Sequence, residues 1–160
     1  MNEGANKATG DFLLFLHADT FLPKNAIALI CETLSSHTIS AGAFDLDFDT
    51  QDKKIKTIAK VASWRSRKTR LPYGDQAIFI KRKVFQRVKG YENFLLMEDV
   101  NLMQKLKKNH FEIKILDQKV ITSARKWEEN GLVKNTLRNW LLISLYFCGI
   151  HPNKLAKFYK

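Results

Sequence analysis

Cysteine, proline and glycine are all scarce in this chain. Among 160 residues there are two cysteines, three prolines and seven glycines. So few prolines and glycines exclude a collagen-like or low-complexity chain. The cysteines are too few for a disulfide scaffold, and Cys31 and Cys148 lie far apart in apolar helical patterns. We therefore expect two buried thiols in a reducing compartment.

Long apolar runs and acidic residues are also limited. No run approaches the roughly 20 apolar residues of a membrane span, and no secretory signal is visible at the start. Only 16 acidic residues face 27 lysines and arginines, so the formal net charge is +11. Such an excess attracts nucleoside diphosphates, nucleic acid or acidic lipid. With 45% apolar residues, the composition predicts a single globular domain over 1–160.

The most informative stretch runs from Gly10 to Thr20. Its apolar part, Phe12–Leu16, predicts a strand buried on both faces in the middle of a mostly parallel sheet. His17 and Asp19 follow where this strand leaves the sheet, and strand ends of this kind form the ligand crevice of open α/β sheets. The two side chains suit a divalent cation, with Asp19 as oxygen ligand and His17 as nitrogen ligand. The alternative is that Asp19 caps the next helix and His17 is an ordinary polar residue.

Three elements are expected between this stretch and residue 70. The first is a helix after Pro23 with apolar residues at Ile27, Leu29, Ile30 and Leu34. The second is an alternating strand over 41–49, whose three aspartates (Asp45, Asp47 and Asp49) we expect on a solvated face. The third is an amphipathic helix over 55–64, followed by a basic run at Arg65, Arg67, Lys68 and Arg70. That run is either a solvated face or a means of attracting an anion.

Two polar segments mark the starts of later elements. Leu71–Gln76 is predicted to be a turn that feeds a strand over 77–80, with Asp75 and Gln76 at its mouth. Glu98 and Asp99 open a helix, where acids complement the positive end of the helix dipole. That position should keep Asp99 ionised and lower its basicity. Two short strands, 111–116 and 119–124, and a further helix should follow.

The C-terminal segment raises a separate question. Residues 140–150 are apolar on nearly every side, and basic residues flank them at Lys134, Arg138, Lys154, Lys157 and Lys160. The run is too short to cross a bilayer, so we expect it to pack into the core. A peripheral membrane contact through 132–150 and packing against a partner subunit, as in a homodimer, are the alternatives.

Several of these stretches together resemble the family 2 glycosyltransferases of the GT-A fold. They are Asn2–Asp11 with the following strand and His-Ala-Asp-Thr, Leu71–Gln76, and Met97–Val100. These motifs are similar to those of one subgroup of the family. The genes of this subgroup are found beside radical-SAM and selenium-domain genes, and the subgroup is linked to arsenosugar biosynthesis. The resemblance implies a Rossmann-like, mostly parallel sheet flanked by helices, with a helical segment over about 125–160. It also implies that the N-terminal nucleotide-binding part of the family is missing.

The resemblance further implies an activity and a set of site residues. The reaction would be metal-dependent, inverting transfer of a sugar from a nucleotide-sugar donor to an acceptor hydroxyl. Mg²⁺ or Mn²⁺ would be held by Asp19, with His17 in the place of the family's first aspartate. Asp99 would be the catalytic base and Glu98 would orient the acceptor. The substrate-binding residues would be Gly74, Asp75, Gln76, Arg125 and Trp127.

A second class of function stays open from the composition alone. A non-catalytic basic module could bind nucleic acid or an anionic membrane, and an inactive fragment is a further alternative. The basic residues are not interleaved with aromatic residues as stacking platforms for nucleic acid are, so we expect no nucleic-acid partner. The expected location is the cytoplasm, with membrane association as the alternative.

Overall fold

Helices and strands alternate along most of the computed structural model, which describes residues 1–158 except for the side chain of Asn130. The strands are β1 (Phe12–Phe15), β2 (Thr20–Phe21), β3 (Ile39–Phe48), β4 (Ile78–Lys81) and β5 (Glu112–Thr122). The helices are α1 (Asn2–Lys7), α2 (Ala26–Ser35), α3 (Lys53–Thr69), α4 (Arg82–Arg87), α5 (Glu98–Lys108), α6 (Arg125–Asn130), α7 (Leu132–Phe147) and α8 (Pro152–Leu155). Two 3₁₀ turns, η1 (Gly74–Gln76) and η2 (Ala156–Phe158), complete the order. The α/β class expected from the sequence is therefore confirmed.

The sheet is mixed. Its strand order is β1-β4-β3-β5-β2, and only the β3–β5 pair is parallel among the described strands. The prediction of a mostly parallel sheet is wrong. An apolar run, or an alternation of apolar and polar residues, indicates which faces of a strand are buried. Neither pattern indicates whether the neighbouring strands are parallel or antiparallel to it.

Strand β1 lies at an edge of the sheet, not in its middle. It pairs with β4 and is only partly buried, so the predicted central position is wrong. The chain then crosses from one edge strand, β1, to the other, β2, between Phe15 and Thr20. These five Cα steps reach at most about 18 Å. Four spacings of a flat sheet would need about 19 Å, so the sheet has to curl.

The strand directions bring the chemically interesting residues to one edge of the sheet. Phe15 of β1 pairs with Ile78 at the start of β4, so the end of β1 lies beside the turn η1 that precedes β4. Strands β1, β3 and β5 run in the same direction, because β4 is antiparallel to both of its neighbours and β5 is parallel to β3. Their carboxyl ends therefore share one edge, as the sequence argument about His17 requires.

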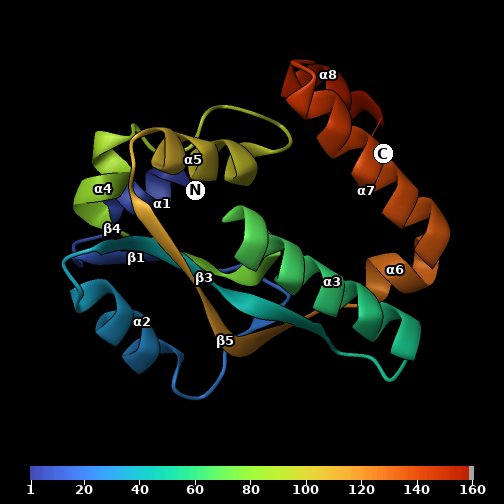
Figure 1. Cartoon of the computed structure of the whole chain (residues 1–160), viewed down its shortest axis with the longest axis horizontal. Helices are drawn as coiled ribbons and strands as arrows, with labels where there is room; N and C mark the ends of the chain where they lie inside the picture. The colour runs from blue at the N-terminus through green and yellow to red at the C-terminus, as the bar shows by residue number, and fades with distance from the viewer. Residues whose placement is uncertain (159–160) are drawn as a thin grey trace.

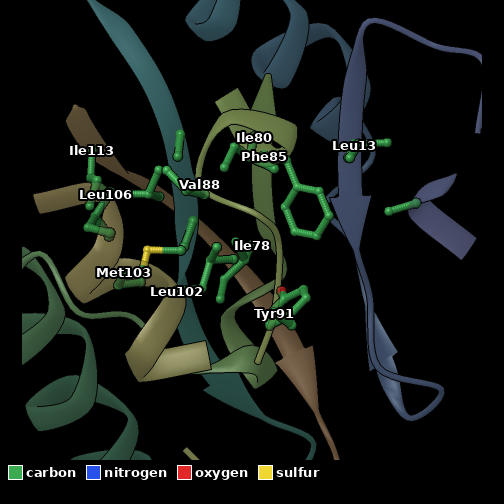
Figure 2. Close-up of a cluster of buried hydrophobic side chains, with 14 residues drawn as sticks. Leu13, Ile78, Ile80, Phe85, Val88, Tyr91, Leu102, Met103, Leu106 and Ile113 are labelled. Atoms are coloured by element: carbon green, nitrogen blue, oxygen red, sulfur yellow. The ribbon is translucent and has the colours of Figure 1, made fainter. Parts of the chain in front are cut away.

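Two buried clusters occupy the two faces of the sheet. One joins α1, α4 and α5 to the strands; Figure 2 shows Leu102, Met103 and Leu106 of α5 packed against Ile78 and Ile80 of β4, with Phe85 and Tyr91 nearby. The other joins α2 and α3 to the opposite-facing residues Phe44, Phe79 and Val120. Figure 1 shows α5 and α2 on opposite sides of the sheet. In α2, Ile30 and Leu34 are buried as expected, but Ile27 is exposed.

The predicted solvated face of β3 is in fact covered by ion pairs. Asp45 is buried and accepts two hydrogen bonds from the guanidinium of Arg67 in α3, with Nε 3.0 Å from Oδ1. Asp47 pairs with Lys56 of the same helix, with Nζ 2.9 Å from Oδ1. The expectation was wrong for Asp45 and Asp47, because basic residues of α3 pack back onto β3 and pair with them, whereas Asp49 is exposed as expected. Arg67 of the basic run is thus paired within the fold, while Lys68 and Arg70 are exposed.

Strand β5 is one continuous strand and not the two strands predicted. Its pairing with β3 shifts between Phe44↔Leu116 and Asp45↔Lys119. Two residues, Asp117 and Gln118, bulge out of the ladder at this point. The bulge places a carboxylate oxygen of Asp117 2.8 Å from Arg67. The polar pair that suggested a turn therefore makes a bulge instead.

The C-terminal segment and the cysteines also differ from expectation. Helix α7 buries only Asn135 and Leu142, so the predicted core packing of the apolar run is wrong. Cys31 and Cys148 are both exposed free thiols and not buried ones. Within residues 1–158, none of the helices combines the length and the apolar content needed to cross a membrane. Lys160, the last predicted flanking residue, lies outside the described residues.

Candidate functional site

A cleft of about 400 Å³ lies at the edge where β1, β3 and β5 end. This volume is within the roughly 300–1,000 Å³ typical of small-molecule sites. The sheet contributes the segments after β1 and β5, the turn η1 and the start of α5 form one wall, and α6 and α7 form another. Most of the residues predicted for the site line this cleft: His17, Asp19, Gly74, Asp75, Glu98, Asp99, Arg125 and Trp127.

Gly74 lies between His17 and Asp99. A Cβ atom at this position would be 2.7 Å from Nε2 of His17 and 3.5 Å from Oδ2 of Asp99. A side chain at this position would displace the imidazole of His17, so glycine allows this close approach. The backbone N–H of Gly74 also donates to Oδ2 of Asp99 at 2.6 Å. Residues from three distant parts of the sequence therefore meet at one point.

The carboxylate of Asp99 is a perturbed acid of the cleft. Burial, together with the negative charges of Glu98 and Asp75, raises the pKa of Asp99 to about 6. The N–H groups of Gly74 and Val100 oppose this rise by donating hydrogen bonds, the latter at 2.7 Å. The expected loss of basicity at the helix start is therefore wrong, because loss of hydration outweighs the helix dipole here.

The backbone around Asp99 is held in an uncommon conformation. Met97, the residue before α5, has a φ of 63°, and Ala77, which follows η1, has a φ of 50°. Residues other than glycine rarely adopt these left-handed values, which cost of order 1 kcal/mol each. Both strained residues flank segments that line the cleft. Strain of this kind is commonly found where a fold must hold functional groups in place.

Asp75 is a second perturbed acid, close to the end of β1. Burial raises the pKa of Asp75, while the positive charges of His17 and Arg65 oppose the rise and the charge of Asp19 adds to it. Its Oδ1 atom is buried and lacks a hydrogen-bond partner within the described part of the chain. A buried carboxylate oxygen without a partner is unusual. Oδ1 of Asp75 is therefore available to coordinate a cation or to accept a hydrogen bond from a ligand in the cleft.

Gln76 does not line the cleft. Its side chain is fully buried and donates to the carbonyl of Phe44 at 2.8 Å, while its Oε1 accepts from Ser66 at 2.9 Å and from the N–H of Tyr73. These bonds tie η1 to β3 and α3. Gln76 therefore holds the turn that presents Gly74 and Asp75, and it is not placed to touch a ligand in this structure.

The opposite wall is basic and aromatic. Arg125 and Lys126 of α6 line it together with Trp127, whose ring contacts Phe48 edge-on at a centroid distance of 6.0 Å. The N–H of Ala124, the residue before α6, donates to a side-chain oxygen of Asp49 at 2.7 Å, which ties the start of α6 to the end of β3. Asp49, predicted to be solvated, thus fixes the start of this wall.

Sequence reasoning missed the part of the cleft that α7 supplies. Asn135, Arg138 and Asn139 line it from within a largely apolar helix. Their spacing of three and four residues puts them on one helical face, and this signal was available from the sequence. Tyr73 was also missed; the guanidinium carbon of Arg65 lies 3.7 Å from its ring centroid. Burial raises the pKa of the Tyr73 hydroxyl.

The residues of the acidic wall were tested for their fit to a metal ion. Within residues 1–158, no group of three or more histidine, cysteine, aspartate and glutamate side chains is arranged to hold an ion by itself. Asp19, His17 and the partnerless Oδ1 of Asp75 nevertheless offer hard oxygen and nitrogen donors. Mg²⁺ is commonly bound by one or two carboxylates plus substrate phosphates, so such a partial set fits an ion that arrives with a phosphate ligand.

Comparisons with known proteins add nothing to this geometry: a scan against protein-family models found no match, and a search of curated proteins found no significant match either.

Proposed function

We propose that the cleft belongs to a GT-A-like, metal-dependent, inverting glycosyltransferase. The observation that carries the proposal is Asp99, a half-buried carboxylate with a pKa of about 6, which accepts a hydrogen bond from the N–H of Gly74 at 2.6 Å in the wall of a ligand-sized cleft. A base works best when its pKa lies near the operating pH, and an ordinary aspartate is far too acidic for that. The narrower assignment to the arsenosugar-linked subgroup rests on the sequence resemblance alone.

The proposed reaction is a single displacement. The acceptor hydroxyl oxygen attacks the anomeric carbon of the donor sugar while Asp99 takes the hydroxyl proton. The bond between that carbon and the phosphate oxygen breaks, and its electron pair leaves with the nucleoside diphosphate. One displacement inverts the anomeric centre. Glu98, beside Asp99 at the cleft, is proposed to orient the acceptor.

The distribution of charge in the cleft supports a diphosphate donor. Acids from the sheet edge, η1 and α5 line one side, and Arg125 and Lys126 of α6 line the other. Guanidinium groups bind phosphate oxygens with two parallel hydrogen bonds, which suits Arg125 to the leaving diphosphate. Trp127 offers an apolar wall beside it. A metal held by Asp19, with His17 and Asp75 next to it, would neutralise charge on the leaving group.

Binding of a nucleoside diphosphate tests the metal half of this proposal. Titrating the protein with UDP, GDP and dTDP in a calorimeter, with and without Mn²⁺, should reveal metal-dependent binding of one of them. The substitution Asp19→Asn should abolish it, because a neutral amide is a poor ligand for a hard cation. The fold should survive, since Asp19 is exposed.

Asp11→Asn is the matched control, because Asp11 is another exposed aspartate that does not line the cleft. It should bind the nucleotide like the parent chain. Unchanged affinity in Asp19→Asn would refute the metal assignment and leave Asp19 as a turn residue between β1 and β2.

A further inference from the structure

Helix α7 carries an exposed apolar face. Its side chains recur at spacings of three and four residues, which places them on one side of the helix. The exposed fractions are 71% for Val133, 65% for Leu137 and Trp140, 59% for Leu141 and 55% for Phe147. Contiguous apolar patches are rare on soluble proteins and mark surfaces that bind something.

The opposite face of α7 belongs to the cleft. Asn135 and Leu142 are buried there, and Arg138 lines the cleft beside them. The helix is therefore fixed to the body by one face, through a hydrogen bond of 2.5 Å from Asn135 to the carbonyl of Lys126. Figure 1 shows α7 at the periphery of the molecule, away from the sheet. In this structure its apolar face is therefore exposed while its other face is held against the cleft.

The charge around this face has a single sign. From Gly131 to Phe158 the chain contains no aspartate or glutamate, while Lys134 is exposed in the first turn of α7, and Lys154 and Lys157 are exposed on α8 and η2, which follow it. Trp140 lies near the centre of the apolar face. Lysines at the margins and aromatic and leucine residues on the other side are typical of helices that lie in a membrane interface.

We propose that α7 docks on an anionic lipid surface, with its apolar face among the acyl chains and its flanking lysines among the head groups. A second copy of the chain fits less well, because an isologous dimer would bring two purely cationic segments together. The inference does not rest on glycosyl transfer. It has one consequence for the cleft: since α7 is one of its walls, docking would hold the cleft within about 10 Å, one helix diameter, of the lipid.

Vesicle flotation tests the proposal directly. The protein should bind vesicles of phosphatidylcholine mixed with phosphatidylglycerol far better than vesicles of phosphatidylcholine alone. Each lysine near an anionic surface should contribute about fivefold in affinity. Raising the salt concentration should weaken the difference, because the lysines are exposed.

Two double variants distinguish lipid binding by the apolar face of α7 from non-specific binding through exposed apolar residues elsewhere. Leu137→Gln with Leu141→Gln should weaken vesicle binding roughly tenfold or more, because apolar surface no longer enters the lipid. The matched control is Phe21→Gln with Ile27→Gln, which removes two equally exposed apolar side chains from β2 and α2. It should bind like the parent chain. Circular dichroism checks that all variants keep their helices.

Tryptophan fluorescence reports the depth of insertion. Emission should shift to the blue on adding anionic vesicles and be quenched by brominated lipid. The shift should be lost in Trp140→Phe and kept in Trp64→Phe, which changes an exposed tryptophan on α3. Equal binding of the α7 variant and the control would overturn the proposal. So would a lipid-free dimer, seen by sedimentation, that the Leu137→Gln and Leu141→Gln changes dissociate.

Discussion

At the scale of single residues, the environment of Asp99 decides its chemistry. Its position at the first turn of α5 stabilises the charged form through the helix dipole, an effect of about 0.3–1 kcal/mol. Burial acts in the opposite direction and raises the pKa to about 6, against 3.8 for an unperturbed aspartate. Loss of hydration is the larger effect because it scales with the whole charge and not with a partial dipole.

Asp99→Asn should lower the rate of a glycosyl-transfer reaction by roughly 10²–10⁴-fold, the usual contribution of a positioned base. The amide keeps the shape and still accepts the hydrogen bond from Gly74, but it cannot take a proton. Nucleotide binding should survive, because the base acts on the acceptor. The parent rate should fall below a pH of about 6, where Asp99 becomes protonated. Glu98→Gln, the control, should be milder; near-normal turnover in Asp99→Asn would contradict the assignment.

The same substitution should change how stability depends on pH. Because the folded-state pKa of Asp99 lies above the unfolded value, the folded chain holds an extra proton between the two pKa values, 3.8 and about 6. Stability should therefore fall as the pH rises through this window, by up to roughly 2–3 kcal/mol. Asp99→Asn should remove this fall, and Asp11→Asn should keep it. Urea unfolding at several pH values measures the difference.

At the scale of elements, ion pairs join α3 to the sheet. Asp45 is buried on β3, and Arg67 reaches both it and Asp117 of the β5 bulge. Hydrogen bonding to Asp45 raises the pKa of Arg67, which keeps its charge firmly in place. One helix residue therefore connects two strands where their register shifts.

Arg67→Met should destabilise the fold by roughly 1–3 kcal/mol, because it leaves the buried carboxylate of Asp45 without its partner. The apolar stem is retained, so packing changes little. Lys68→Met is the matched control; Lys68 is exposed on the same helix and should cost less than about 0.5 kcal/mol. Chemical denaturation of both variants compares the two costs. Equal stability would mean that water replaces the guanidinium at Asp45.

At the scale of the whole molecule, the net charge of +11 does not lie on one free basic surface. Arg67 and Lys56 pair with acids of β3, and Lys105 pairs with Glu92. The other exposed lysines are spread over several elements, with Lys53 on α3, Lys83 on α4, Lys108 on α5 and Lys154 on α8 among them. Basic residues dispersed over several elements in this way differ from the clustered basic face that is typical of nucleic-acid binding.

Binding of a labelled DNA oligonucleotide should therefore weaken steeply with salt and vanish near physiological ionic strength, as for non-specific contacts. Binding of a nucleoside diphosphate in Mn²⁺ should persist under the same conditions. Fluorescence anisotropy and calorimetry give the two curves. Salt-resistant DNA binding would favour the alternative of a non-catalytic basic module.

Local pattern was enough to place most elements and several site residues. Gly74 and Asp75 were expected at a turn before a strand, and Asp99 at the start of a helix, because turn chemistry and helical period are read within a few residues. The amphipathic helix over 55–64 proved to be the middle of α3. All of these features depend on neighbours in the sequence.

The tertiary structure decided what depends on distant partners. It placed β1 at an edge, brought Gly74 between His17 and Asp99, and covered Asp45 with Arg67. It left the apolar face of α7 exposed while the other face formed the cleft. Periodicity states which residues share a face, but strand order, burial and the pKa of Asp99 follow from what that face meets, and this is set by chain segments far away in the sequence.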